Sequence, residues 1–222
     1  YVRQKYKLIL WEMRGHGRSD SPEDPAEYSE ARTMEDMKLI LDTEGVNEAV
    51  IGGLSLGGYM TFAFYLADPE MTKALIPCDT GPGYRNPEAR EGWNKMAHER
   101  ADEFESQGLA ALSDSTEVQA SVSVHKSAQG LARAARGMLT QVDGRVMELL
   151  PNITVPTLIV LGANDEPFVT ATDYMEKKIP GSRKLVIADA GHASNMHQPQ
   201  VFNDAVLQFL DEVWKSQDRA GS

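Results

Sequence analysis

The chain has 222 residues, of which 41% are hydrophobic and 25% charged, the composition of an ordinary globular protein. A formal net charge of −11 argues against nucleic acid or an anionic membrane as a partner, because an acidic protein attracts neither. The single cysteine, Cys78, excludes an intrachain disulfide framework, and no apolar run is long enough to predict a membrane-spanning helix. We therefore expect a globular protein in the cytoplasm.

The first predicted strand covers residues 7–11 and is followed by a glycine-rich turn, Arg14–Ser19. The turn contains His16, which invites a catalytic interpretation, but we interpret it as a residue that helps to fold the loop. Thr33 is then the expected N-cap of an amphipathic helix that ends at Gly45. A strand, a helix and a second strand in succession predict a parallel pair with a right-handed crossover.

The next motif, Gly52–Gly58, separates a short hydrophobic run from a longer apolar segment. Short apolar runs beside glycine are typical of buried strands, and the longer segment is typical of a helix. Ser55 is thus expected on a tight strand-to-helix turn. We expect Gly53 and Gly57 to flank it because a Cβ at either position would crowd the neighbouring backbone. The helix N-terminus beneath the serine would favour developing negative charge.

A further strand is expected to end at Cys78, after which the pattern changes. Asn86 is a suitable N-cap with Pro87 at the first helical position, and the sequence is helical in character from there to about residue 150. A helical insertion between strands of a parallel sheet predicts a cap over the carboxyl edge of that sheet. The expected division is a first core part over 1–82, a helical cap over 83–150 and a second core part over 151–222.

The second core part contains two more predicted strands, over 156–161 and 184–187, and a final helix with a broad apolar stripe. Asp165 follows the first of these strands and His192 follows the second. A serine hydroxyl needs a base within hydrogen-bond reach to attack a carbonyl, and the base needs an orienting carboxylate. The order along the chain is Ser55, then Asp165, then His192. Hydrolases that carry the serine on a strand-to-helix turn have the serine, acid and histidine in this order.

Other residues compete for two of the three roles. Glu166 and Asp79 are alternative acids, since one is adjacent to Asp165 and the other also ends a strand. His197 is the alternative base, but it stands just before the final helix. The pair His192 and His197 lacks the cysteine cluster or HExxH spacing of a metal site, so we expect no metal ligands.

The chain resembles the α/β-hydrolase superfamily, and most closely its helical-capped group of small esterases and enol-lactonases. The resemblance covers essentially the whole chain and rests on four segments: Arg14–Ser19, Gly53–Gly58, the turn at Asp165 and Gly191–His192. It implies Ser55 as nucleophile, His192 as base, Asp165 as its orienting acid and the backbone N–H of Leu56 as one oxyanion donor. It also implies that no metal or organic cofactor is needed.

One departure from that family concerns the start of the chain. Family members usually carry three further strands before the segment that begins near Tyr1, and the loop after the third gives the second oxyanion donor. Nothing in this sequence corresponds to them, so the sequence is a fragment, or the sheet is completed by rearrangement or by a partner chain. We expect a homo-oligomer, because an unpaired central strand edge is adhesive. Hydrolysis should be weak, because one missing donor costs about 100- to 1,000-fold in rate.

The function that follows is a serine hydrolase acting on a small carboxylic ester or lactone. A carbon–carbon bond hydrolase, a thioesterase or a perhydrolase would use the same triad. A binding protein on a catalytically impaired hydrolase scaffold is the alternative from another class. The serine at position 55 disfavours a haloalkane dehalogenase, which uses an aspartate there.

Overall fold

The computed structural model describes residues 2–220, with side chains described as far as residue 215. The chain forms two compact units. The first comprises Tyr1–Leu10, Val46–Pro82 and Leu149–Ser222, and the second comprises Trp11–Gly45 and Gly83–Glu148. Residues 11–45 thus cluster with the helical segment, whereas the sequence placed them in the first core part. The division into core and cap remains a prediction.

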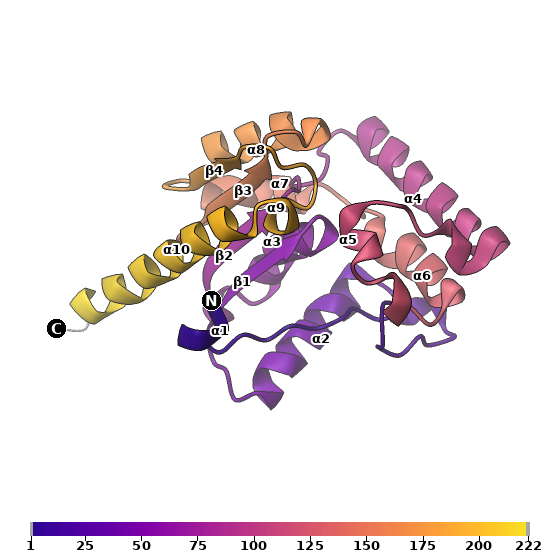
Figure 1. Cartoon of the computed structure of the whole chain (residues 1–222), viewed down its shortest axis with the longest axis horizontal. Coiled ribbons are helices and arrows are strands. Elements are labelled where there is room, and N and C mark those ends of the chain that lie inside the picture. The colour runs from indigo at the N-terminus through magenta and orange to yellow at the C-terminus, as the bar shows by residue number, and fades with distance from the viewer. Residues whose placement is uncertain (1, 221–222) are drawn as a thin grey trace. The chain divides into compact units, whose positions relative to one another are not determined.

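The first unit contains a sheet of four parallel strands in the order β1-β2-β3-β4 (Figure 1). Helix α3 (Leu56–Ala67) connects β1 to β2, and helix α8 (Glu166–Lys178) connects β3 to β4. This architecture confirms the predicted α/β fold with a parallel sheet. The strands are β1 (Ala49–Leu54), β2 (Thr72–Cys78), β3 (Leu158–Gly162) and β4 (Arg183–Ile187).

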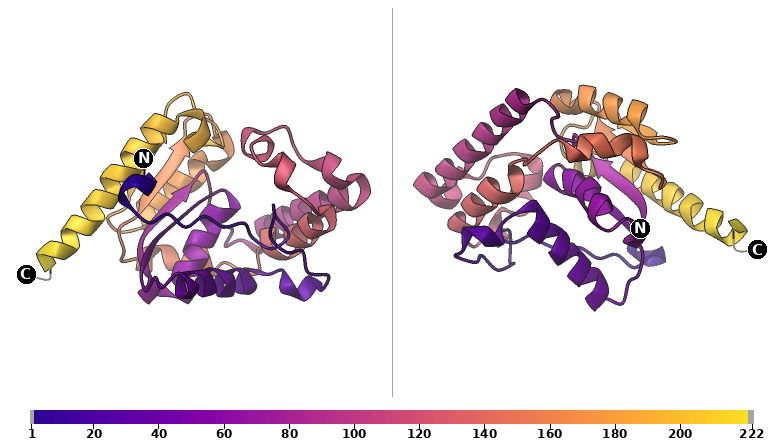
Figure 2. Two further views of the ribbon diagram at one scale, coloured as in Figure 1. Left: turned by 60° about the horizontal axis from the view of Figure 1, so that its bottom comes forward. Right: turned by 180° about the vertical axis from the view of Figure 1, so that it is seen from behind.

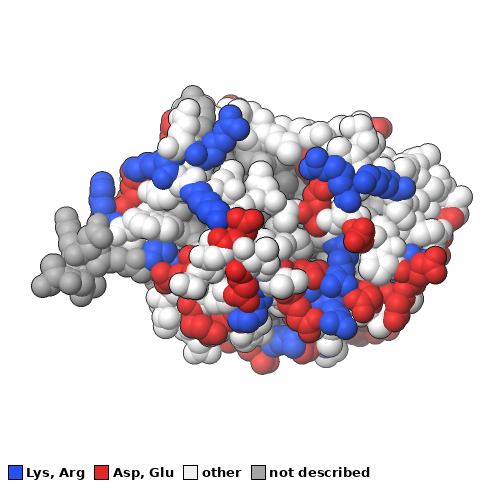
Figure 3. Space-filling view, turned by 90° about the horizontal axis from the view of Figure 1, so that it is seen from below, with Lys and Arg blue, Asp and Glu red and all other residues white. Residues whose placement is uncertain are grey.

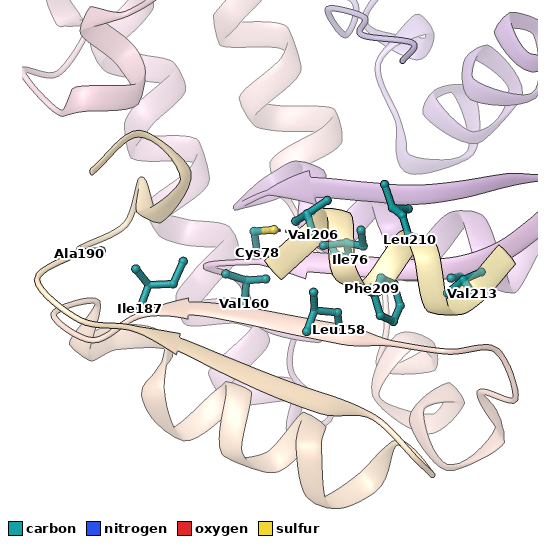
Figure 4. Close-up of a cluster of buried hydrophobic side chains, with 11 residues drawn as sticks. Ile76, Cys78, Leu158, Val160, Ile187, Ala190, Val206, Phe209, Leu210 and Val213 are labelled. Carbon is teal, nitrogen blue, oxygen red and sulfur yellow. Dashed lines mark hydrogen bonds between the residues drawn. The ribbon is translucent and has the colours of Figure 1, made fainter. Parts of the chain in front are cut away.

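One face of this sheet is covered by the final helix, α10 (Pro199–Ala220), while α3 and α8 lie on the other face (Figures 1 and 2). The buried part of the predicted apolar stripe packs against alternate residues of the strands, as the two-residue period of a strand requires (Figure 4). Cys78 belongs to this cluster as a small buried hydrophobe. The cluster includes Ala74, Ile76, Cys78, Leu158, Val160, Ile187, Val206, Phe209, Leu210 and Val213.

The predicted strand over residues 7–11 is wrong. The segment follows helix α1 (Val2–Lys5) as irregular chain, and Leu8 and Leu10 are 50% and 82% exposed. Strand β1 pairs with β2 on one side, and no other segment of residues 2–220 forms a ladder with it. An apolar run becomes a strand only where a neighbouring strand forms a ladder with it, and no strand of the described residues pairs with residues 7–11.

The second unit is helical. Helix α2 begins one turn before the predicted N-cap Thr33, because Ser29 accepts the N–H of Arg32 with its side chain. Thr33 lies inside the helix, and its hydroxyl donates to the carbonyl of Ser29. The expected N-cap Asn86 is confirmed, since its side chain accepts two N–H groups at the start of α4. The helices are α2 (Glu30–Thr43), α4 (Pro87–Gln107), α5 (Thr116–Gln119), α6 (Ala128–Ala134) and α7 (Arg145–Leu149), whose last residue belongs to the first unit.

Short helical turns join these elements. The first unit also contains α9 (Ser194–His197), which follows β4. A π-helical turn, η5, continues α6, and both contribute to the small apolar core of the second unit with α4. The turns are η1 (Pro25–Glu27), η2 (Pro69–Met71), η3 (Gly108–Ala111), η4 (Val122–Val124), η5 (Ala135–Leu139) and η6 (Leu150–Asn152).

The charged surface is mixed. Acidic and basic side chains are interspersed over the face drawn in Figure 3. A helix long and apolar enough to cross a membrane does not occur among the residues that the structure describes.

Candidate active site

Ser55 occupies a strained turn between β1 and α3. Its backbone angles are φ 55° and ψ −116°, a region that residues with a Cβ rarely adopt. Its N–H donates to the carbonyl of Cys78 at 2.9 Å, and its own carbonyl accepts the hydroxyl of Thr80 at 2.7 Å. The Ser55 side chain makes no capping hydrogen bond to α3. The hydroxyl is therefore not used to hold the helix that it precedes.

Of the two glycines that flank Ser55, one has the expected role and the other does not. A Cβ on Gly53 would lie 2.4 Å from the carbonyl carbon of Gly57, so Gly53 is required by close backbone approach, as predicted. A Cβ on Gly57 would meet nothing within 4 Å, so the predicted crowding there is wrong. The crowded partner is Gly58, whose Cβ would lie 2.6 Å from the side chain of Thr80. Position 57 lies in the first turn of α3, where the Cβ direction is open.

Asp165 and His192 form a hydrogen-bonded pair. Nδ1 of His192 lies 2.9 Å from Oδ2 of Asp165, and the two side chains are 30% and 5% exposed. A carboxylate only accepts, so Nδ1 carries the proton, and Nε2 of the neutral ring holds a lone pair. This is the arrangement of a histidine base oriented by an acid. Of the alternative acids, Glu166 is exposed at the start of α8.

Asp79, the other alternative acid, is buried and bonds elsewhere. Its carboxylate accepts hydrogen bonds from Gly162 and Ser194, and its exposed fraction is 0%. Burial raises the pKa of the Asp79 carboxyl group, while these hydrogen bonds act in the opposite direction. Asp165 is the carboxylate in contact with the ring of His192.

The alternative base, His197, supports the turn that precedes His192. Its Nδ1 accepts the N–H of Gly191 at 3.0 Å, so the proton of the neutral ring is on Nε2. Besides its contact with Asp165, the ring of His192 stacks on the ring of Phe168, with ring centroids 5.2 Å apart and planes inclined by 23°. Phe168 lies in the first turn of α8, and its N–H donates to the carbonyl of Asp165. The sequence did not indicate this stacking.

Backbone strain gathers at the carboxyl ends of the strands. Among the residues that the structure describes, three other than glycine have positive φ: Ser55, Asp79 and Asp189, in the turns after β1, β2 and β4. Ladder pairing places Leu54 beside Cys78, Cys78 beside Val160, and Gly162 beside Ile187. The turns that carry Ser55, Asp165 and His192 therefore follow the same edge of one sheet.

Metal-binding groups of three or more His, Cys, Asp or Glu are absent from the residues that the structure describes.

Comparison with known proteins identifies the family and the fold. A model of the alpha/beta hydrolase family matches residues 3–205. The 3-oxoadipate enol-lactonase 1 of Acinetobacter baylyi is 31% identical over 239 residues, which cover 96% of this chain and 81% of that protein. A thermophilic esterase from Thermogutta terrifontis superposes with a TM-score of 0.70 at 28% identity, covering 83% of this chain and 73% of that one. The structure of MenH from S. aureus has a TM-score of 0.80 at 24% identity, with coverage of 90% and 82%, and supports the fold alone.

Proposed function

Because the chain belongs to the alpha/beta hydrolase family, we propose that it is a serine hydrolase that cleaves a small carboxylic ester or lactone. The observation that carries the proposal is the 2.9 Å contact between His192 and Asp165 at the sheet edge where Ser55 occupies its strained turn. The enol-lactonase and esterase relatives support the same class of substrate.

In the proposed reaction, the Ser55 hydroxyl attacks the carbonyl carbon and passes its proton to Nε2 of His192. The contact with Asp165 stabilises the imidazolium that results and holds the ring in the required tautomer. The backbone N–H of Leu56, the first residue of α3, is one donor to the oxyanion. His192 then returns the proton to the leaving alcohol oxygen, which gives an acyl-enzyme on Ser55. Water, deprotonated by His192, hydrolyses that ester and regenerates the serine.

The test compares wild type with Ser55→Ala on a short p-nitrophenyl ester and with a fluorophosphonate probe. We expect the substitution to abolish labelling and to lower kcat on the order of 10⁴- to 10⁶-fold, because the nucleophile is removed. Ser182→Ala is the matched control, since that hydroxyl only donates to backbone carbonyls before β4. Its rate and labelling should equal those of wild type.

Two results would contradict the proposal. Equal hydrolysis by wild type and Ser55→Ala would exclude Ser55 as nucleophile. A folded wild-type protein that neither turns over the ester nor reacts with the probe would favour a binding protein on a hydrolase scaffold.

A further inference from the structure

Asp79 is a buried and strained carboxylate directly after strand β2. It has 0% exposure and a φ of 47°. Its N–H donates to the carbonyl of Val160 at 2.9 Å, which fixes the residue against β3. Burial of a carboxylate and a positive φ at a residue with a Cβ both cost free energy. Interactions of the Asp79 side chain must therefore offset this cost in free energy.

The carboxylate of Asp79 joins two separate loops. Oδ1 accepts the N–H of Gly162 at 2.7 Å, and Oδ2 accepts both the N–H and the hydroxyl of Ser194, at 3.1 and 2.5 Å. All three donors are neutral. Burial and the nearby Asp165 carboxylate raise the pKa of Asp79, so these hydrogen bonds are what favours its ionised form. Hydrogen bonds to an ionised acceptor are stronger than those between neutral groups.

The two loops are those of the proposed acid and base. Gly162 lies three residues before Asp165, whose N–H donates back to the Gly162 carbonyl at 3.0 Å. Ser194 lies two residues after His192. A change in the bonds of Asp79 would thus alter the separation of the two turns that carry the His192–Asp165 contact.

A backbone contact ties the same two loops at a second point. The N–H of Asn164 donates to the carbonyl of Ala190 at 2.8 Å. A Cβ on Gly162 would lie 2.2 Å from the carbonyl oxygen of Gly191, so the loops approach too closely for a side chain between them. Two points of attachment fix the relative orientation of the loops better than one. Apart from the His192–Asp165 contact itself, the attachment through Asp79 is made by a side chain.

We propose that Asp79 is a positioning residue that aligns His192 with Asp165 by holding Ser194 and Gly162 to one carboxylate. It acts through the two loops and touches neither substrate nor the reacting atoms. The kinetic consequence rests on the proposed function, whereas the effect on the His192–Asp165 hydrogen bond does not.

The first variant is Asp79→Asn, which keeps the size of the side chain. The amide has one acceptor oxygen, so its NH₂ group must face the backbone N–H of either Gly162 or Ser194, and that N–H loses its acceptor. We expect kcat per fluorophosphonate-titrated site to fall about 10- to 100-fold, since small misplacements of reacting groups have effects of this size. KM should change less than about twofold, because the binding contacts remain.

The second variant, Ser194→Ala, tests the same contact if Asp79→Asn does not fold. It removes one donor and keeps the charge and both backbone contacts of Asp79. We expect a fall in kcat of about threefold, in the same direction.

Glu30→Gln is the control for a change that only weakens the fold. Glu30 is a carboxylate of the second unit with 8% exposure, and it pairs with Arg145. It should lower thermal stability, as Asp79→Asn does, and leave kcat per titrated site unchanged.

A spectroscopic measurement separates this proposal from the proposed function. The proton on Nδ1 of His192 gives a downfield NMR resonance when it is bonded to Asp165. We expect this resonance to weaken and to exchange faster with water in both variants and to be unchanged in Glu30→Gln. Folded Asp79→Asn with wild-type kcat per site and a wild-type resonance would overturn the positioning role. If wild type fails to hydrolyse esters, the proposed function fails, and the resonance still decides the role of Asp79.

Discussion

The dipeptide Gly-His occurs twice in the chain, at Gly15–His16 in the second unit and at Gly191–His192 in the first. The two histidines form the same kind of contact through the same atom. Nδ1 of His16 lies 3.1 Å from the carbonyl of Arg14, and Nδ1 of His192 lies 2.9 Å from the carboxylate of Asp165. Since both acceptors require a proton on Nδ1, both neutral rings have their lone pair on Nε2.

Each dipeptide also has a second histidine that accepts a backbone N–H. His125 accepts from Gly17, and His197 accepts from Gly191, both through Nδ1 at 3.0 Å. The two turns therefore share the same kinds of contact, although the donor glycine follows His16 in one turn and precedes His192 in the other.

His16 and His192 differ in the group that accepts the proton of Nδ1, which is a carbonyl for His16 and a carboxylate for His192. A carboxylate stabilises the imidazolium that forms when Nε2 takes a proton, and a carbonyl does so far less. Removal from solvent lowers the pKa of His16, which further favours its neutral form. A histidine after a glycine is thus a candidate base only when the fold brings a carboxylate to its Nδ1.

Asp165→Asn should remove this distinction, and among the variants that test the comparison of the two histidines it has the largest expected effect. The amide cannot stabilise the imidazolium and favours the tautomer with the proton on Nε2, so kcat should fall on the order of 10⁴-fold. The measurement is ester turnover per folded molecule, with thermal unfolding to verify the fold.

Glu166→Gln is the matched control for Asp165→Asn, because it neutralises the adjacent carboxylate, which is exposed. It should keep turnover within about twofold of wild type. A larger loss in Glu166→Gln than in Asp165→Asn would show that Glu166, and not Asp165, is the acid.

The sequence predicted the parts of the site that depend on local pattern. A strand, a glycine-flanked serine and an apolar helix are contiguous in the chain, so the turn at Ser55 could be placed from the glycine motif and the apolar runs beside it. Asp165 and His192 could be placed because parallel strands deliver the residues that follow them to one edge of the sheet. Local pattern also located Asn86 as the start of α4.

The rest depends on contacts between distant residues. The bond from Ser194 to Asp79 joins residues 115 positions apart, and nothing near either one marks it. Residues 7–11 have the composition of a strand, but a strand also needs a pairing partner. The open Cβ direction of Gly57 follows from its place in the first turn of α3, which spacing around the serine does not reveal. The place of Asp79 after a predicted strand makes it an alternative acid, whereas its hydrogen bonds appear only in the folded chain.

His16→Ala should affect stability rather than chemistry. It removes the hydrogen bond to the Arg14 carbonyl and leaves a small void, so the free energy of unfolding should fall by about 1–2 kcal/mol. Turnover per folded molecule should stay within about twofold of wild type, because His16 has no carboxylate on Nδ1. His98→Ala, at an exposed position of α4, is the control and should change stability by less than about 0.5 kcal/mol. A severe loss of kcat in stably folded His16→Ala would make the two dipeptides alike in function as well as in geometry.

The smallest expected effect is on the pH dependence of stability, and it involves His125, which accepts the N–H of Gly17 next to the first dipeptide. Removal from solvent lowers the pKa of His125 below its ordinary 6.5, although the nearby Glu12 carboxylate acts in the opposite direction, and the ring of His16 lies 6.3 Å away. The folded protein therefore favours the neutral ring, which alone can accept the N–H of Gly17. This contribution to stability is fully present above pH 6.5 and is lost as the pH falls below it, because the unfolded chain takes up the proton first.

His125→Asn should reduce this pH dependence, because its side-chain oxygen takes the place of Nδ1 as acceptor and does not titrate. Free energies of unfolding at about pH 7.5 and about pH 5.5 should then differ less in the variant than in wild type, by up to the roughly 1 kcal/mol of one hydrogen bond. Exchange of the Gly17 amide should accelerate on acidification in wild type and less in the variant. His98→Asn should keep the wild-type dependence. An unchanged dependence in His125→Asn would mean that the proton is taken up elsewhere, and His16, whose pKa burial also lowers, would be the next group to replace.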